Sequence, residues 1–476
     1  MPGARRTIVA SLFLVFLLLN LHYLRHQRPK CQHSTLHDQR SQLWQQLHPL
    51  LARYAPQCPA PILRGSAGAV RFDSVTPIPR EDYIENRNEI ELPMQTAHDG
   101  FVQSLHTLNS PRAFISGTKG IVTAAGGTYL PTLVVTLHLL RRTNSTLPVE
   151  VFLQDDSEYE AEICERVLPA LNANCILLSS ITNTNTTRIK GYQLKAFAIL
   201  FSTFETLLWL DADNIPLHDP ALLLTSAPFT TTGLVTWPDF WTNTAAGIYF
   251  TISRQPTPES TSRASTEAGT LLLSKRTHLP TLLLAAYYNF HGPEYYYPLL
   301  NQGAPGAGDK DTFLHAATAL DLPFYAVRTP PVDIGRMNTA AKATAALNAG
   351  FVQVDPGEDF AVHRMGPDGR KGAGLGLTPR AFFIHAGAPE FNPGKELLGR
   401  KLRGLDGRPA RLWTYPPMAL ESIGFDAERV VWEETVSVAC AYEGLFVSWR
   451  NNTGLCEGVR AHWRAVFKGD DVVVGG

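Results

Sequence analysis

Two aspartates, Asp211 and Asp213, stand at the end of an apolar run in the segment ETLLWLDADNIPLHDP, residues 205–220. On an extended strand they point to the same side, because side chains alternate between the two faces. Neighbouring buried carboxylates repel each other unless a positive charge compensates them, and their oxygens suit Mg²⁺ or Mn²⁺. The motif therefore predicts a divalent-cation site, although a turn followed by a helix cap would use the same residue types.

A second enzyme class also places two aspartates at the end of a strand. Phosphatases with an aspartyl nucleophile use such a pair together with magnesium. Their motif normally follows an early strand and continues into a small turn, whereas this one follows several elements and continues into Asn214, Ile215 and Pro216. The position favours a cation site over a nucleophile. Asp219, before Pro220, is predicted to cap the next helix.

The elements that must position these carboxylates alternate between strand and helix patterns. Strand patterns are KGIVTAAGGTYL, LPVEVFLQDD, NCILLSS and TLLWLDAD, and helix patterns are PTLVVTLHLLRRT, EYEAEICERVLPAL and GYQLKAFAILFSTF. Strand, helix and strand in this order indicate parallel pairing. The sequence therefore predicts an α/β fold with a mostly parallel central sheet. Ligands of such sheets bind at the carboxyl ends of the strands, where Asp211 and Asp213 lie.

Three further polar residues stand out by their surroundings. Lys195 is the only charge in an otherwise apolar helix, so either a bound anion or a nearby acid must neutralise it. Asp309 and Lys310 open the predicted helix DKDTFLHAA, and the spacing alone favours Asp309 as its N-cap. His385 follows an apolar strand in FFIHAG, a setting that by itself is typical of a core or turn histidine.

Four blocks in the same order carry a family resemblance. They are the segment from Gly191 to Pro220, GLVTWPDFW, the segment from Glu267 to Ala317, and FFIHAGAPEFNP. Together they resemble the fungal Golgi alpha-mannosyltransferases of glycosyltransferase family 71, most closely the alpha-1,2 enzymes that branch mannan. The resemblance implies a GT-A nucleotide-sugar transferase fold, GDP-mannose as donor, Mn²⁺ as cofactor, retention of anomeric configuration, and a mannan or glycoprotein glycan as acceptor. An alpha-1,3-mannosyltransferase of the same family and a catalytically silent mannan-binding protein remain as alternatives.

The same resemblance assigns roles to individual residues. Asp211, Asp213 and His385 correspond to the metal site, and Asp309 joins the two aspartates as a catalytic residue through the matching GDK block. The family pattern expected after His385 has lysine where this chain has Glu390, which leaves the charge at that position open. The residues expected to bind the donor or the acceptor are Lys195, Trp237, Asp239, Glu267, Gln302 and Lys310.

The N-terminal region differs in composition from the rest of the chain. Residues 8–24 are almost uninterruptedly apolar and are flanked by basic residues, which indicates a transmembrane signal anchor more than a cleaved signal peptide. The expected organisation is a cytosolic tail at 1–7, the anchor at 8–24, a stem at 25–95 and a lumenal catalytic domain at 96–476. The resemblance implies a type II protein of the Golgi membrane. It also suggests assembly into a complex with other Golgi glycosyltransferases. With 42 basic and 43 acidic residues, no overall charge attracts nucleic acid.

Cysteines and glycosylation sequons are consistent with a lumenal body. Pairing of neighbours predicts the disulfides Cys31–Cys58, Cys164–Cys175 and Cys440–Cys456, one of 15 ways to join six cysteines. Free buried thiols are the alternative. Sequons begin at Asn144, Asn185 and Asn451. The region after residue 400 carries no chemical motif and is predicted to contribute packing and a closing disulfide.

Overall fold

The computed structural model describes residues 36–106, 108, 114–182, 189–337, 346–364, 378–387, 389–396 and 402–468. The expected membrane anchor at 8–24, Cys31 and Asn185 lie outside these residues, so the predictions made for them stay predictions. Among the residues described, none of the helices combines the length and the apolar character that a membrane crossing requires.

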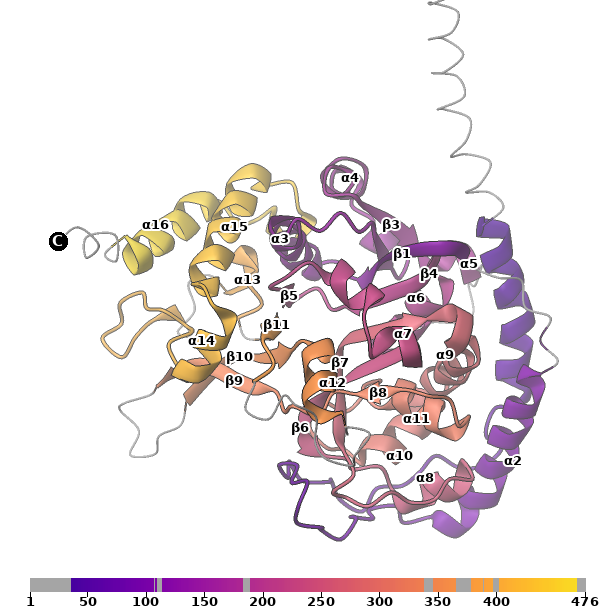
Figure 1. Cartoon of the computed structure of the whole chain (residues 1–476). Helices are drawn as coiled ribbons and strands as arrows, with labels where there is room; N and C mark the ends of the chain where they lie inside the picture. Colours follow the sequence, from indigo (N-terminus) through magenta and orange to yellow (C-terminus); the bar gives the residue numbers. More distant parts are fainter. Residues whose placement is uncertain are drawn as a thin grey trace, which may run out of the picture.

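A seven-stranded mixed sheet forms the centre of the molecule (Figure 1), in the order β3-β2-β1-β4-β7-β6-β8. Strands β3, β2, β1 and β4 run parallel, whereas β7 is antiparallel to both β4 and β6. The predicted α/β fold with mostly parallel strands is confirmed. The strands are β1 (Ile115–Ala124), β2 (Val149–Leu153), β3 (Ala173–Leu177), β4 (Phe204–Leu210), β6 (Leu234–Thr242), β7 (Ala264–Ser274) and β8 (Tyr325–Ala326).

Helices cover both faces of this sheet because its strands bury side chains on both sides. Leu208 and Leu210 of β4 point into a core shared with α3 (Tyr129–Arg142), α15 (Ala427–Tyr442) and α16 (Leu455–Phe467). Leu207 and Trp209 point into a second core, whose helices are α2 (Arg87–Leu105), α6 (Gln193–Phe201), α8 (Gly247–Ile252), α9 (Lys275–Phe290) and α11 (Thr312–Ala319). This alternation follows from the two-residue period of a strand.

A second sheet of four antiparallel strands lies beside the carboxyl end of β4. Its order is β5-β11-β10-β9, with β5 (Asn214–Pro216), β11 (Ala381–His385), β10 (Ala346–Val354) and β9 (Val332–Met337). Strand β5 begins directly after Asp213, and His385 of β11 is paired with Asn214. The register therefore places the end of β11 against the aspartate motif.

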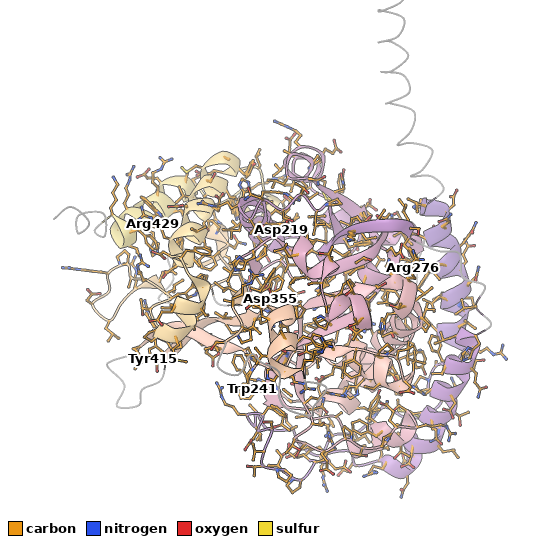
Figure 2. The ribbon with its side chains drawn as sticks, viewed as in Figure 1. Asp219, Trp241, Arg276, Asp355, Tyr415 and Arg429 are labelled. Atoms are coloured by element: carbon orange, nitrogen blue, oxygen red, sulfur yellow. A yellow bond between two sulfur atoms is a disulfide. The ribbon has the colours of Figure 1, made fainter. Side chains whose placement is uncertain are left out.

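Shorter helical segments connect these elements. The predicted helix around EYEAEICERVLPAL is confirmed in position but is divided into a π-helical turn (Ile163–Val167) and α4 (Leu168–Ala170). Asp219, labelled in Figure 2, accepts a hydrogen bond from the Ala221 N–H and caps the 3₁₀ turn Pro220–Thr225, as predicted. The others are α5 (Leu178–Thr182), α7 (Phe229–Thr232), the π turn Gly292–Tyr296, α10 (Tyr297–Asn301), α12 (Pro356–His363), α13 (Pro393–Glu396), α14 (Pro417–Ile423) and the 3₁₀ turns Asp156–Glu158 and Val447–Trp449.

Residues 36–95, which the sequence assigned to the stem, pack against the body. Residues 36–53 form a helix whose Leu43, Leu47 and Leu51 are fully buried in the same core as α6. Arg40 of this helix forms a buried ion pair with Glu150, 3.2 Å between Nη2 and Oε1. The leucines are four residues apart, the spacing of one helix face.

Two of the predicted disulfides are confirmed. Cys164 is bonded to Cys175, and Cys440 is bonded to Cys456, which joins α15 to α16. The C-terminal region thus contributes helices and a closing disulfide, as expected. Cys58 forms no disulfide with any described residue, and its predicted partner Cys31 lies outside them.

Candidate active site

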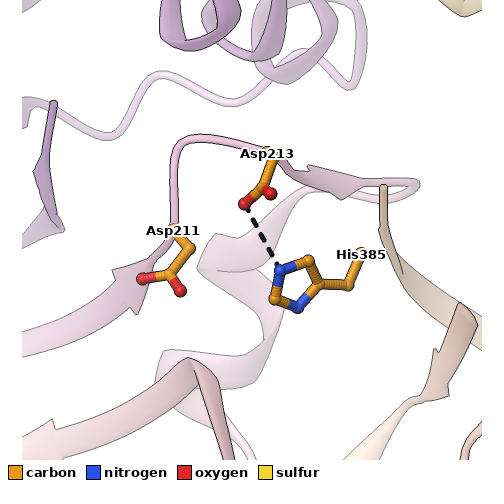
Figure 3. A group of neighbouring side chains, drawn as sticks. All are labelled: Asp211, Asp213 and His385. Carbon is orange, nitrogen blue, oxygen red and sulfur yellow. Dashed lines mark ion pairs between the residues drawn. The ribbon is translucent and has the colours of Figure 1, made fainter. Parts of the chain in front are cut away.

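The aspartate motif and His385 meet at the junction of the two sheets (Figure 3). Atoms of Asp211, Asp213 and His385 that could act as ligands all lie within 4.8 Å of one another. The His385 Nε2 is 3.3 Å from the Asp213 Oδ1. The backbone fixes this approach, because the Ala386 N–H donates to the Asp213 carbonyl oxygen at 3.0 Å. Two carboxylates and an imidazole thus converge from two separate segments of the chain.

Asp211 is held in place on both of its oxygens. Its Oδ1 accepts a hydrogen bond from the Trp209 Nε1–H at 2.7 Å and lies 3.2 Å from the Lys195 Nζ, which also donates to Oδ2 at 3.5 Å. The indole and the carboxylate are two residues apart at the end of β4, which places them on the same side of the extended chain. Burial raises the pKa of Asp211, and the positive charge of Lys195 opposes this rise. The carboxylate is therefore oriented before any ligand arrives.

Lys195 of α6 connects Asp211 to Asp309. Its Nζ lies 3.4 Å from the Asp309 Oδ2 and donates a 2.6 Å hydrogen bond to the Ala268 carbonyl oxygen. Burial alone would lower the pKa of Lys195, but Asp211, Asp309 and Glu267 outweigh it and raise the pKa above its ordinary value. Of the two explanations that the sequence left open for this lone charge, the structure shows the pairing with nearby acids.

Asp309 belongs to this site and not to a helix cap. Helix α11 begins at Thr312, and Asp311 takes the N-cap position without a capping side-chain hydrogen bond. The N-cap interpretation of Asp309 is therefore wrong, because the turn at 309–311 delays the helix. The side chain of Asp309 is buried beside Lys195, and burial raises its pKa to about 6 although Lys195 opposes the rise. Its Oδ2 makes no hydrogen bond within the described part of the chain.

Glu267 lies on the other side of His385. Its Oε1 is 3.3 Å from the His385 Nδ1 and accepts a hydrogen bond from the Gly269 N–H, while its Oε2 accepts one from the Gln353 Nε2–H at 2.8 Å. Burial would raise the pKa of Glu267, but His385 and Lys195 lower it to about 2. Glu267 is therefore an ionised carboxylate that orients the imidazole.

Gly269 allows this close approach. A Cβ atom at this position would come within 2.7 Å of the His385 Nδ1 and 2.8 Å of the Glu267 Oε1. A glycine in the interior of a strand often marks such an approach. The glycine in the segment EAGT therefore indicated a close approach of some side chain to β7, but the sequence alone did not identify that side chain as His385.

The site suits a divalent cation. Burial would lower the pKa of His385, but Asp213 and Glu267 raise it well above its usual value. The two carboxylates on either side of the ring thus favour a positive charge at this position. Two carboxylates and one imidazole are compatible with a divalent cation, and the three residues that the sequence predicted as its ligands lie together.

Asp239 and Lys310 form an ion pair beside the site. The Lys310 Nζ lies 3.1 Å from the Asp239 Oδ2 and 3.4 Å from the Ser265 Oγ. Burial raises the pKa of Asp239, and Lys310 opposes the rise. Because Lys310 follows Asp309, this pair extends the polar region of the site along β6.

Two predicted substrate contacts have structural roles instead. Trp237 is 1% exposed, and its Nε1–H donates to the Val354 carbonyl oxygen at 2.9 Å. Gln302 is fully buried, its Oε1 accepts from the Tyr83 N–H, and its Nε2 donates to the Glu81 and Thr244 carbonyl oxygens. Neither side chain has a polar group left for a sugar hydroxyl, so the structure does not support a polar contact of either residue with a substrate. Both residues lie within the blocks that carry the family resemblance, and the sequence alone did not indicate that their polar groups bind the backbone.

Several side chains at the site were not expected from the sequence. Lys395 pairs with Glu390 at 3.0 Å, and its Nζ lies 5.7 Å from the centroid of the Tyr129 ring. The family pattern has lysine at position 390. This chain has a glutamate there, and Lys395 supplies a positive charge next to it. Tyr129 and Tyr192 are 45% and 63% exposed, and the negative charge of Asp213 contributes to the raised pKa of Tyr129 after burial and Glu390. The sequence contained no pattern that identified these residues as part of the site.

Comparison with known proteins identifies the family. The family model described as "Mannosyltransferase putative" matches residues 118–262 and 254–355, a span that includes both aspartates, Glu267 and Asp309. The chain belongs to this mannosyltransferase family.

Fungal proteins are among the relatives of this chain, which confirms the resemblance stated from the sequence. It is 38% identical over 298 residues to the alpha-1,2-mannosyltransferase MNN24 of Candida albicans, covering 56% of this chain and 42% of the relative. It is 32% identical over 445 residues to MNN21 of the same species, covering 80% and 66%, and 37% identical over 382 residues to MNN2 of Saccharomyces cerevisiae, covering 67% and 64%. The chain therefore spans from under half to about two thirds of these relatives.

Solved glycosyltransferases are more distant from this chain. GlyE of Streptococcus pneumoniae aligns with a TM-score of 0.30 and 16% identity, covering 44% of this chain and 45% of that chain. Mouse xyloside xylosyltransferase 1 aligns with a TM-score of 0.27 and 12% identity, covering 44% and 85%.

Proposed function

We propose that the protein is a metal-dependent, retaining alpha-1,2-mannosyltransferase with a GT-A fold, which moves mannose from GDP-mannose to an alpha-mannoside acceptor on mannan or a glycoprotein glycan. The observation that supports this most directly is the convergence of Asp211, Asp213 and His385 within 4.8 Å, in a chain of a mannosyltransferase family. Fungal relatives that are named alpha-1,2-mannosyltransferases support the linkage.

In the proposed reaction, Asp211, Asp213 and His385 would hold Mn²⁺. A bound cation would neutralise the charge on the departing diphosphate. The chain's own part is to orient these three side chains, through Trp209 on Asp211 and Glu267 on His385. Lys195 adds a fixed positive charge behind Asp211, held by Asp309. Such preorganised groups need no rearrangement during the reaction, which is the main source of electrostatic catalysis.

Location in the Golgi membrane as a type II protein is part of the proposal. Two disulfides favour an oxidising compartment, since cytosolic proteins rarely keep them. Asn144 and Asn451, the two sequon residues within the described part of the chain, are both exposed. Both could therefore accept a glycan in the lumen.

The test is transfer by the purified full-length protein. It would be incubated with GDP-mannose, Mn²⁺ and an alpha-mannoside, and the product linkage and anomeric configuration would be determined by NMR. We expect an alpha-1,2 product that a chelator abolishes and that returns when Mn²⁺ is added back. An alpha-1,3 product would assign the protein to the sister activity. Donor hydrolysis and transfer both absent from a folded sample would favour the silent mannan-binding alternative.

A further inference from the structure

A large cavity lies next to the site described above. Its volume is about 810 Å³, and its walls come from residues 236–240 of β6, residues 261–266 at the start of β7, residues 324–328 around β8, and His363 of α12. Figure 1 shows β6, β8 and α12 grouped below the small sheet. A volume in the range of about 300–1,000 Å³ is typical of ligand sites. The cavity exceeds the needs of a single sugar ring.

The walls combine aromatic rings with charged side chains. Phe240, Phe324 and Tyr325 line the cavity together with Arg263, Arg328 and Asp239. Sugar rings have apolar faces edged by hydroxyl groups, so aromatic faces and planar hydrogen-bonding groups are complementary to them. Sites of this kind, with apolar walls and a few fixed polar groups, are typical of small organic ligands.

Arg263 is half-buried in the wall of this cavity. Its guanidinium lies 5.9 Å from the centroid of the Phe324 ring, and it makes no hydrogen bond or ion pair among the residues that the structure describes. Asp311, an acid nearby, accepts hydrogen bonds from the Thr266 N–H and hydroxyl, both at 2.9 Å from its Oδ1, while its Oδ2 has no hydrogen-bond partner among the described residues. Burial lowers the pKa of Arg263, and Asp311 opposes the change. A half-buried guanidinium without a partner is costly, so a ligand that accepts its hydrogen bonds would be favoured.

The cavity is joined to the candidate active site through two strands. Thr266, in its wall, directly precedes Glu267, and Asp239, also in its wall, pairs with Lys310, which directly follows Asp309. Pro238 of β6 and Thr266 of β7 are paired in the sheet, and both residues line the cavity. The Asp239–Lys310 ion pair thus connects the wall of the cavity to the segment that carries Asp309.

We propose that this cavity binds the non-reacting sugar rings of an oligosaccharide acceptor, with Arg263 donating hydrogen bonds to ring hydroxyls and Phe324 packing against a ring face. The inference rests on the proposed function for the reaction itself, but oligosaccharide binding can be measured without transfer. It assigns the enzyme a preference for acceptors of two or more sugars over a single mannoside.

The test compares Arg263→Ala and Phe324→Ala with the wild type. Phe324→Ala serves as the second variant in case the arginine change impairs folding, which circular dichroism would reveal. Arg408→Ala is the matched control, because the Arg408 side chain is 85% exposed and its only ion pair is to Asp406 at 3.9 Å within the described residues. The readouts are the dissociation constant of alpha-linked mannotriose by calorimetry and the ratio of kcat/KM for mannotriose to that for methyl alpha-mannoside.

We expect Arg263→Ala and Phe324→Ala each to weaken mannotriose binding and to reduce the kcat/KM ratio by about tenfold or more, the loss typical of one good polar or aromatic contact. Arg408→Ala should change neither. Unchanged mannotriose binding in both variants would overturn the inference, and so would an equal loss for both acceptors. Manganese-dependent hydrolysis of GDP-mannose by the wild type is measured separately, so failure of the proposed function is distinguished from failure of the acceptor site.

Discussion

His385 Nε2 lies 3.3 Å from Asp213 Oδ1, although the two residues are far apart in the sequence. Strand β11 makes the contact by pairing with β5, which starts one residue after Asp213. The same histidine is flanked by Glu267 from the central sheet. The candidate metal site is therefore built across two sheets, and substitutions in either sheet should affect it.

Asp211→Asn and Asp213→Asn should each remove transferase activity while leaving the fold intact. The amide keeps the shape of the side chain but loses the charge that a cation needs, so we expect a loss of about 100-fold or more in kcat, as for other preorganised electrostatic groups. Asp219→Asn is the matched control, because asparagine caps a helix as well as aspartate does. Activity would be measured as mannose transfer. Wild-type turnover in either site variant would refute the metal assignment.

Gly269→Ala should weaken the metal site from within the neighbouring strand. The added methyl group would lie within 2.7 Å of the His385 imidazole and 2.8 Å of Glu267, so one of them must move. We expect at least a tenfold weaker apparent affinity for Mn²⁺, measured by manganese titration of activity. Gly247→Ala is the control, because nothing lies within 4 Å of a Cβ there. Equal manganese dependence in both variants would contradict the role of the close approach.

Stability should fall as the pH drops from about 6.5 towards 4, in part because of His98. Burial lowers the pKa of His98 to about 4, against 6.5 for the unperturbed group. The unfolded chain therefore binds the proton first, and this costs about 2 kcal/mol of unfolding free energy between pH 7 and pH 5. Urea unfolding at several pH values would measure the loss. His98→Gln should show a flatter pH dependence; a variant that is as pH-sensitive as the wild type would exclude this contribution.

The helix at 36–53 should be required for stability of the whole body. Leu47 is fully buried in the core that also contains α6, so Leu47→Ala should cost about 2–5 kcal/mol of unfolding free energy. The neighbouring Gln46 is exposed, and Gln46→Ala should change stability by less than about 0.5 kcal/mol. Denaturant unfolding of the full-length variants checks both. A chain that starts at Gln95 is expected to aggregate, and its folding with native stability would show that the helix is dispensable.

Asn144 and Asn451 should carry glycans if the body is lumenal. Both are exposed, and each begins an intact sequon. Asn144→Gln and Asn451→Gln should each remove one endoglycosidase-sensitive shift on a gel, whereas Asn348→Gln, outside any sequon, should remove none. Protein from the native host without any glycan at either site would argue against the proposed topology.

Local patterns determined a large part of the fold. The strands and helices from Ile115 to Leu210 follow the alternation that the sequence predicted, because two-residue and helical periods are properties of neighbouring residues. The disulfide Cys164–Cys175 and the cap at Asp219 were also local. Residues 36–95, by contrast, were assigned to a stem because the segment is polar and broken by prolines, and only SQLWQQL within it has a short helical pattern.

By itself, the sequence determined that Asp211 and Asp213 end a buried strand on one face, and that Lys195 needs a charged partner. Only the tertiary structure decided which partner Lys195 has, which strand brings a histidine to the aspartates, and whether Trp237 and Gln302 remain free for a ligand. The physical reason is that these contacts depend on the pairing of β11 with β5 and of β7 with β4, which join segments far apart in the chain. A strand's own residues specify which faces are apolar, but its partner is selected by the packing of the whole core.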